Sequence, residues 1–202
     1  MKKLVVATRN PGKIRELELL LQGMVETVLP LSFFPDLPEV EEDGATFAEN
    51  ALKKARFAME ATGLPALADD SGLVVDALHG RPGVHSARFA GEGAADSANN
   101  LKLLEEMAGI PYVKRSAAFH CVLAFCTPGG ECRTFDGSLS GMVLESPQGD
   151  GGFGYDPLFF VPEYGETLAQ LSLEIKNRIS HRGHAHAQFR SYLAGQVTIS
   201  LQ

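Results

Sequence analysis

Apolar positions in the first half of the chain recur in two alternating patterns. Residues 3–8 form a continuous valine-rich run, which is typical of a strand covered on both faces. The next block, residues 11–21, places its apolar side chains at helical spacing. Continuous apolar runs and segments with apolar residues at helical spacing then alternate along the chain. We therefore expect strands at 3–8, 25–29 and 65–68, a strand or hairpin arm at 73–78, and helices at 11–21, 46–61 and 97–107.

The second half has longer apolar segments. Residues 115–126 and 131–144 are separated by Pro128-Gly129-Gly130, which predicts an antiparallel hairpin. A short helix is expected at 167–174, and a last helix after Ser180. Helix and strand alternation followed by a hairpin predicts an α/β protein with a mixed sheet.

Length and charge narrow the class of protein. A chain of 202 residues with 45% hydrophobic content can bury a full core, so we expect a single domain over 1–202. The net charge of −7 argues against a non-specific nucleic-acid-binding protein, whose signature is a basic face. With no secretory leader and no apolar stretch long enough to cross a bilayer, we expect a cytoplasmic protein without membrane partners. The odd set Cys121, Cys126 and Cys132 is interpreted as reduced core thiols.

Two adjacent acids, Asp69 and Asp70, follow the apolar run at 65–68 and precede Ser71 and Gly72. Gly72 permits a tight turn, so the acids are expected at the end of a strand. Two neighbouring carboxylates near a low-dielectric interior need a cation or several donors to ionise, and a hard divalent ion meets that need. The alternative is a loop whose acids cap the next segment or face water.

The junction between the first strand and first helix predicts an anion site. Asn10 suits the helix N-cap, Pro11 suits the first turn, and Gly12 and Lys13 follow within that turn. Backbone N–H groups at a helix N-terminus, beside Arg9 and Lys13, suit a phosphate. The glycine pattern of a P-loop is missing, and an Asn cap with a lysine can also serve stability alone.

An acidic run leads into the helix at 46–61. One of its carboxylates is a candidate metal ligand that turns inward, and Lys53 or Lys54 on the helix is a candidate phosphate contact. The alternative is a solvated charged face. The acids of the run are Glu39, Glu41, Glu42 and Asp43.

The Gly-rich segment 149–157 predicts a base-binding loop. Its glycines let the backbone approach a ligand, Phe153 and Tyr155 offer flat apolar faces, and Asp156 is an acceptor. The alternative is a hairpin loop whose aromatic rings fill the core. Further on, His181 and Arg182 fall in the first turn of the last helix, where the helix dipole disfavours positive charge, and such a violation often marks a site.

Four stretches together resemble the inosine triphosphate pyrophosphatases, which are also described as dITP/XTP pyrophosphatases. They run from the first strand to the last helix, so the resemblance covers essentially the whole chain. Each is weak alone, but their order and spacing make the combination specific. The stretches are residues 8–13 (TRNPGK), 68–72 (ADDSG) continuing through 80–88 (GRPGVHSAR), 153–157 (FGYDP) and 180–183 (SHRG).

The resemblance implies a homodimeric α/β fold with an elongated central mixed sheet flanked by helices, and two lobes with the active site in the cleft between them. It also implies Mg2+-dependent hydrolysis of the deaminated purine nucleotides ITP, dITP and XTP to the monophosphate and pyrophosphate. This activity cleanses the nucleotide pool and prevents incorporation into DNA and RNA. The ranking of the three substrates, the exclusion of GTP, the dimer interface and the number of metal ions stay open.

Carried over residue by residue, the resemblance assigns the triphosphate to Thr8, Asn10 and Lys13, with Lys54 assisting. Asp70 binds the metal and accepts a proton, and Asp69 supports it. Glu42 is chosen as a further ligand, with Glu39 and Glu41 left as alternatives. Phe153 stacks on the base, Asp156 and Lys176 contact base or ribose, and His181 and Arg182 donate to the purine 6-oxo group. Arg9 stands where many relatives carry a smaller residue, and its direction is left open.

The expected substrate-binding residues are Thr8, Arg9, Asn10, Pro11, Gly12, Lys13, Lys54, Ser71, Phe153, Gly154, Tyr155, Asp156, Lys176, His181 and Arg182, and the expected metal ligands are Asp70, Glu42 and Asp69.

Two other classes compete with this interpretation. A phosphomonoesterase of the haloacid dehalogenase type would form an aspartyl phosphate on Asp69, but its acids follow the first strand, which here ends in Thr8-Arg9-Asn10. A receiver-like signalling module is much shorter and does not need the loop at 153–156. The product released from ITP, orthophosphate or pyrophosphate, separates the first rival, and a lack of turnover would favour the second.

Overall fold

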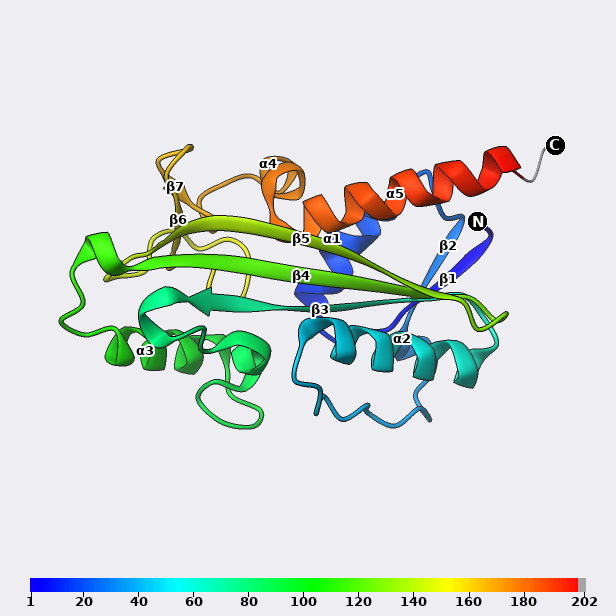
Figure 1. The fold of residues 1–202 in the computed structure, drawn as a ribbon, viewed down its shortest axis with the longest axis horizontal. Helices are drawn as coiled ribbons and strands as arrows, with labels where there is room; N and C mark the ends of the chain where they lie inside the picture. The colour runs from blue at the N-terminus through cyan, green and yellow to red at the C-terminus, as the bar shows by residue number, and fades with distance from the viewer. Residues whose placement is uncertain (200–202) are drawn as a thin grey trace. The chain divides into compact units, whose positions relative to one another are not determined.

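Within residues 1–199, which the computed structural model describes, seven strands form one sheet in the order β2-β1-β3-β4-β5-β6-β7 (Figure 1). β1 pairs in parallel with β2 and β3, whereas β6 pairs antiparallel with β5 and β7. The expected α/β fold with a mixed sheet is therefore confirmed. The strands are β1 (Lys3–Val6), β2 (Thr27–Pro30), β3 (Ala66–Val75), β4 (Ser116–Cys126), β5 (Cys132–Val143), β6 (Phe159–Val161) and β7 (Glu166–Thr167).

The helices expected at 11–21, 46–61 and 97–107 are confirmed, with ends that differ by at most one residue. Each of the first two begins at a side-chain cap. Asn10 accepts from the amides of Gly12 and Lys13, and Thr46 forms a capping box with Glu49. The α-helices are α1 (Pro11–Leu21), α2 (Phe47–Thr62), α3 (Asp96–Glu106), α4 (Leu173–Ile179) and α5 (His181–Ile199), and the short 3-10 turns are η1 (Leu31–Phe33), η2 (Asp76–Leu78), η3 (Gly83–Arg88) and η4 (Tyr112–Lys114).

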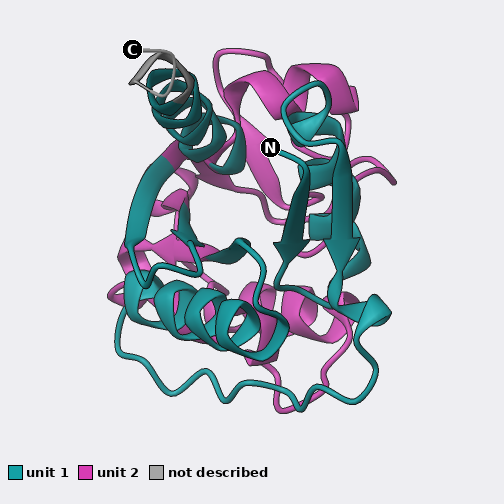
Figure 2. Cartoon of the chain, turned by 90° about the vertical axis from the view of Figure 1, so that its right-hand side faces the viewer, with its two compact units in different colours: residues 1–70, 121–137, 182–202 teal, residues 71–120, 138–181 magenta. Residues whose placement is uncertain are grey.

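The chain divides into two compact units (Figure 2). Unit 1 consists of residues 1–70, 121–137 and those from 182 on, and unit 2 consists of residues 71–120 and 138–181. This division is compatible with the two lobes that the resemblance implies. The cleft between them stays a prediction.

In unit 1 the sheet is covered on both faces, as the valine-rich first strand predicts. Leu4 and Val6 pack into a cluster with residues of α1 and α5, whereas Val5 and Ala7 pack into a second cluster with residues of α2. Alternate residues of a strand point to opposite faces, so each residue of β1 and of the segment 66–70 of β3 is assigned to the α1/α5 face or the α2 face by its position.

In unit 2 one apolar cluster includes Leu73, Leu103 and Phe159. Beside it lies a buried cation. The Arg115 guanidinium donates to four backbone carbonyl oxygens, those of Met107, Ile110, Val143 and Leu144. Arg115 therefore has a structural role, because a buried charge is tolerated only where hydrogen bonds satisfy it.

Two strand and helix predictions are wrong. β3 continues through the acidic pair and Gly72 to Val75, so the acids lie inside a strand, and Gly72 does not form a turn. Pairing within the sheet keeps this segment extended. The helix expected at 167–174 is replaced by β7 and then by α4, which begins at Leu173 after the N-cap Ser172.

The prediction that all three cysteines are reduced is also wrong. Cys126 and Cys132 form a disulfide, with their Cα atoms 4.2 Å apart, because the hairpin turn between β4 and β5 sets them opposite each other. Cys121 keeps a buried thiol. Among the described residues, no helix has the length and apolar content that a bilayer crossing requires.

Candidate active site

The two adjacent acids lie on opposite faces of the sheet. Leu67 of β3 belongs to the α1/α5 cluster, and Ala66 and Ala68 belong to the α2 cluster. The alternation of the strand therefore directs Asp69 toward α1 and α5, and Asp70 toward α2. The two carboxylates are separated by the strand itself, so their mutual repulsion is smaller than adjacency in sequence suggests.

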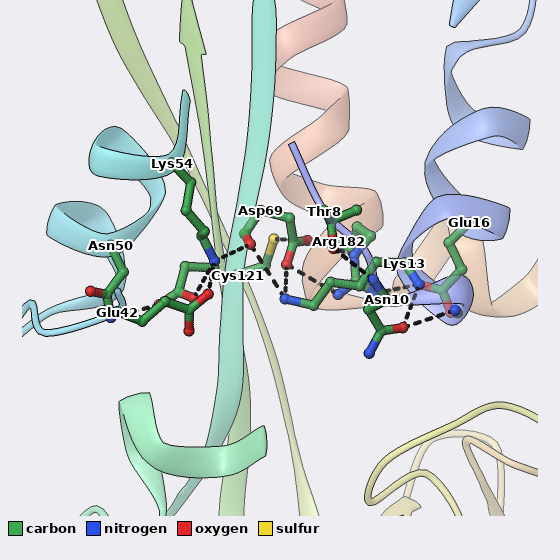
Figure 3. Close-up of polar contacts among 12 residues, drawn as sticks. Thr8, Asn10, Lys13, Glu16, Glu42, Asn50, Lys54, Asp69, Cys121 and Arg182 are labelled. Carbon is green, nitrogen blue, oxygen red and sulfur yellow. Dashed lines mark hydrogen bonds and ion pairs between the residues drawn. The ribbon is translucent and has the colours of Figure 1, made fainter. Parts of the chain in front are cut away.

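Asp69 is 1% exposed and is neutralised by two cations on its face. Lys13 Nζ lies 2.5 Å from its Oδ1 and Arg182 Nε lies 2.7 Å from its Oδ2 (Figure 3). The buried Cys121 thiol also donates to Oδ2, at 3.2 Å. Burial alone would raise the pKa of Asp69, but Arg182 and Lys13 outweigh it and hold this pKa well below its usual range.

Arg182 is 1% exposed and joins a second carboxylate, that of Glu16 on α1, to Asp69. Burial disfavours the guanidinium charge, but Asp69 and Glu16 outweigh it and raise the pKa of Arg182. A charge buried to this degree is stable only when paired, and here the pairing is on two sides.

Asp70 faces α2, where two side chains one helical turn apart each take one of its oxygens. Lys54 Nζ lies 2.8 Å from Oδ1, and Asn50 Nδ2 donates to Oδ2 at 3.3 Å. Lys54 also lies 2.6 Å from Glu42 Oε1. Burial raises the pKa of Asp70 and outweighs the opposing effect of Lys54 and Lys13. The structure therefore brings Glu42, Lys54 and Asp70 into one cluster.

At the α1 N-terminus, the amides of Gly12 and Lys13 donate to Asn10 Oδ1 at 2.8 and 3.1 Å, so both already have an acceptor. Pro11 is the first helical residue. Thr8 Oγ1 accepts from the Asn10 amide. Asn10 therefore caps the helix, as the alternative interpretation of this motif expects. Lys13 is the cation of the motif that contacts the acidic pair, through Asp69.

Arg9, whose direction the sequence leaves open, points to the loop before α2. Its guanidinium donates to the Leu37 carbonyl oxygen at 2.8 Å and lies 3.9 Å from the Glu39 carboxylate. Glu39 is therefore engaged by Arg9, whereas Glu42 contacts Lys54. This difference favours Glu42 over Glu39 as the acid of the run that joins Asp70.

In unit 2, Phe153, Asp156 and Lys176 form a separate group. Lys176 Nζ lies 2.5 Å from Asp156 Oδ2 and 4.8 Å from the centre of the Phe153 ring. Asp156 Oδ2 also accepts from the Phe153 amide at 2.9 Å. A Cβ at Gly152 would lie 2.0 Å from that oxygen, so this turn requires glycine.

The rest of the Gly-rich segment 149–157 is held by α3. Asp96 Oδ2 accepts from the Gly154 amide at 2.7 Å, and Asn100 Nδ2 donates to the Gly154 carbonyl at 2.9 Å. Tyr155 is 4% exposed and donates from its hydroxyl to the Ser86 carbonyl at 2.8 Å. Burial and the nearby Asp96 raise the pKa of Tyr155. Tyr155 therefore fills the core, which is the alternative to base binding that the sequence left open for the aromatic residues of this segment.

His181 and Arg182, which are adjacent in sequence, belong to different units. The His181 ring stacks on Phe119 in unit 2, with centroids 4.7 Å apart and planes 10° apart. Ser71 follows Asp70 in β3 and is half-buried.

A model of the Ham1 family matches residues 4–192. The chain belongs to the Ham1 family. It is 62% identical over 196 residues to the dITP/XTP pyrophosphatase of Geobacter sulfurreducens, covering 97% of this chain and 98% of that protein. Among solved structures, a HAM1 protein from Coxiella burnetii is 42% identical, with a TM-score of 0.86 and coverage of 96% of this chain and 100% of that one. The Staphylococcus aureus Ham1 protein is 41% identical, with a TM-score of 0.85 and coverage of 96% and 100%.

Three residues of this Ham1-family site were not predicted from sequence, namely Glu16, Asn50 and Cys121. All are buried and contact the acidic pair or its cations. Glu16 and Asn50 carry a sequence signal, because each is a polar residue on the buried stripe of an otherwise amphipathic helix. Cys121 carries none, since a buried cysteine on a strand is ordinary.

The carboxylates near Lys54 could bind Mg2+ if the phosphates of a bound substrate supplied further ligands. Among the described residues, no group of three or more His, Cys, Asp or Glu side chains is arranged to hold a metal ion alone. Glu42 and Asp70 share one cation, Lys54, at 2.6 and 2.8 Å. Mg2+ is commonly bound by one or two carboxylates together with substrate phosphates, so this pair fits it. Asp69 fits less well, because Lys13 and Arg182 engage both of its oxygens.

Proposed function

We propose that this chain hydrolyses the deaminated purine nucleoside triphosphates ITP, dITP and XTP to the monophosphate and pyrophosphate, and so cleanses the nucleotide pool. The identity to proteins named dITP/XTP pyrophosphatases over nearly the full chain supports the substrate class. The observation that carries the chemistry is that Lys13 and Lys54 meet at the backbone carbonyl of Asp69 in β3, where Lys54 also contacts the carboxylates of Asp70 and Glu42.

The two lysines account for phosphate binding. Each ammonium group is held by a carboxylate, Lys13 by Asp69 and Lys54 by Asp70 and Glu42. Burial lowers the pKa of Lys54, but Asp70 and Glu42 outweigh it and raise this pKa, so the ammonium stays charged. Fixed positive charge in a partly buried site stabilises the charge that develops on phosphate oxygens during transfer.

Glu42 and Asp70 are proposed to hold Mg2+ together with the triphosphate. The ion supplies charge neutralisation on the transferring and leaving phosphate groups. Asp69, with two cationic partners, supports Lys13 and Arg182 rather than lending a lone pair to the ion.

Asp70 is proposed as the general base. Water attacks the α-phosphorus in line, its proton passes to Asp70, and the bond from the α-phosphorus to the bridging oxygen breaks, so pyrophosphate leaves. Burial raises the pKa of Asp70, which makes this carboxylate a better proton acceptor than an exposed one.

Base selection is proposed to rest on the residues that the family resemblance assigns to the base. Phe153 stacks on the base, and Asp156 and Lys176 contact base or ribose. His181 and Arg182 donate to the 6-oxo group. The 6-amino group of adenine would face these donors with another donor, and such a mismatch can reject an analogue by about 10⁴-fold.

The test is product analysis with ITP, XTP, dITP, ATP and GTP, each with and without Mg2+. Pyrophosphate release from the first three, abolished by removal of Mg2+, is the expected result. Orthophosphate as the first product would favour a phosphomonoesterase instead, and equal rates with ATP would overturn the proposed selectivity.

We also propose that the chain acts as a homodimer in the cytoplasm, where its substrates arise. Light scattering of the purified protein tests the dimer. A mass of one chain, at concentrations at which the enzyme is active, would contradict it.

A further inference from the structure

Asn50 on α2 is fully buried, at 0% exposure, and the other buried residues of this helix are three alanines and Met59. A polar side chain in such a position is unfavourable unless hydrogen bonds satisfy it, and asparagine is a weaker helix former than leucine or alanine. Both of its polar atoms have partners. Oδ1 accepts from the Gly44 amide at 2.8 Å, and Nδ2 donates to Asp70 Oδ2 at 3.3 Å.

The orientation of this amide is determined by its partners. The Gly44 partner is an N–H group, which requires an acceptor, so the oxygen of Asn50 must face it. The nitrogen then faces the Asp70 carboxylate, which accepts hydrogen bonds. No exchange of the two atoms satisfies both partners. Asn50 therefore joins two points of unit 1 that are 26 residues apart in sequence, as the numbers of Gly44 and Asp70 give.

The contact at Gly44 is also close in space. A Cβ added at this residue would lie 2.6 Å from Asn50 Oδ1 and 2.9 Å from the Glu49 Cβ. Only glycine lets the loop approach the helix to this distance. Glu42 lies two residues before Gly44, so the contact determines where the backbone that carries the Glu42 carboxylate meets α2.

Lys54, one helical turn after Asn50, contacts the other oxygen of Asp70, Oδ1, and also contacts Glu42 Oε1. Lys54 supplies charge. Asn50 supplies none, so its contribution is positional, and it donates to Asp70 Oδ2, the oxygen that Lys54 does not contact.

We propose that Asn50 is a positioning residue. Its two hydrogen bonds fix the Asp70 carboxylate and the loop that carries Glu42 relative to each other, so that both acids can bind one divalent cation. The inference rests on the proposed function only in naming that cation as Mg2+. Hydrogen-bonding partners of metal ligands typically change metal affinity or activity by about 10- to 100-fold when they are removed.

The test uses the full-length Asn50→Leu variant, which keeps the number and branching of the side-chain heavy atoms and removes both hydrogen bonds. Mn2+ is titrated into the protein, with and without the α,β-methylene analogue of ITP, and unbound Mn2+ is followed by electron paramagnetic resonance. We expect Mn2+ affinity to fall about tenfold, and kcat for ITP to fall by a similar factor. The KM for ITP should stay within about threefold, because the lysines that bind phosphate remain.

Asn99→Leu is the matched control. Asn99 is also a buried helical asparagine with two hydrogen bonds, but both partners are backbone groups, those of Ala87 and Ala90. This variant should lose stability without a change in Mn2+ affinity, and so it separates a positional effect from a general loss of packing.

Gly44→Ala gives a second variant that leaves Asn50 in place and should also weaken Mn2+ binding, in case Asn50→Leu does not fold. A folded Asn50→Leu or Gly44→Ala protein with Mn2+ affinity and kcat within twofold of the unmodified chain would overturn the inference. If the unmodified chain binds Mn2+ but releases no pyrophosphate from ITP, the proposed function fails. The comparison of Mn2+ affinities then still decides the role of Asn50.

Discussion

Lys13 and Lys54 donate to the same atom, the backbone carbonyl oxygen of Asp69, at 3.3 and 2.9 Å. They come from different helices, α1 and α2, and two ammonium groups this close repel each other. The acids around them make the arrangement stable, and an incoming polyphosphate would relieve the repulsion further. In the proposed function, this convergence is the feature that would receive the triphosphate.

Lys54→Met should lower kcat/KM for ITP by about 10²- to 10³-fold, because it removes a charge that contacts both Asp70 and Glu42. Lys53→Met is the control, since Lys53 is exposed and pairs with Asp43 at 2.7 Å. Steady-state pyrophosphate release measures both variants. Equal losses in the two would show that the charge of α2 as a whole, and not the position of Lys54, is responsible.

Asp70→Asn should lower kcat by about 10²- to 10⁴-fold and leave nucleotide binding within a few-fold of the unmodified chain. The change removes the proton acceptor and one ligand charge, but it keeps Lys13 and Lys54. Turnover and the dissociation constant of the α,β-methylene analogue of ITP are the two measurements. Near-normal turnover would show that another group takes the proton.

Replacing Arg182 should narrow the preference for ITP over ATP, but the choice of substitution matters. Arg182→Ala leaves the buried carboxylates of Asp69 and Glu16 without this partner, and loss of one member of a buried ion pair costs about 3 to 5 kcal/mol. The double change Arg182→Gln with Glu16→Gln removes one charge of each sign. The ratio of kcat/KM values for ITP and ATP, measured below the melting temperature, is the readout. An unchanged ratio would place the selective donor elsewhere.

His186 should make the protein less stable in mild acid. Burial, with Arg190 nearby, lowers the pKa of this imidazole from 6.5 to about 4. The folded chain therefore keeps His186 neutral, whereas the unfolded chain protonates it below pH 6.5. The stabilisation is fully present above pH 6.5 and is lost as the pH falls to about 4, by about 3 kcal/mol in total. Urea unfolding at several pH values, for the unmodified chain and for His186→Gln, measures the difference, and parallel curves for the two would contradict it.

Asp96→Ala should raise the KM for ITP by about 3- to 10-fold with little change in phosphate contacts, because Asp96 accepts from the Gly154 amide next to Phe153. Asp76→Ala is a control in η2 of the same unit. Binding of inosine monophosphate and of inorganic pyrophosphate, measured separately, locates the effect. Weaker pyrophosphate binding alone would show that Asp96 does not act through the Gly-rich segment 149–157.

Local signals predicted most of the helices and the long strands. Caps at Asn10 and Thr46 and regular apolar spacing determine where α1 and α2 begin, and both are short-range features. The short strands β6 and β7 were missed because segments of two or three residues carry no periodicity, and pairing with β5 makes them extended. The strand end expected at Asp70 failed for a similar reason, since neighbouring strands hold β3 extended through Gly72.

The sequence predicted most residues of the candidate site, but not which side chains contact one another. Acidic and basic side chains were found from composition and motif. The partners that hold them, Asn50 for Asp70 and Glu16 for Arg182, depend on contacts between segments far apart in sequence. Each is a polar residue on the buried stripe of its helix, but the group that it contacts there depends on how that helix packs on the sheet.

The alternation of β3 has a consequence for how this sequence can change. Asp69 and Asp70 have different partners because consecutive residues of an extended strand point to opposite faces of the sheet. Losing or gaining one residue between Ala66 and Asp69 would exchange their surroundings, turning the carboxylate meant for Asn50 and Lys54 toward Arg182 instead. Surface loops in general tolerate insertions and deletions, whereas a change of one residue in this short strand segment would move each acid to the wrong face of the sheet.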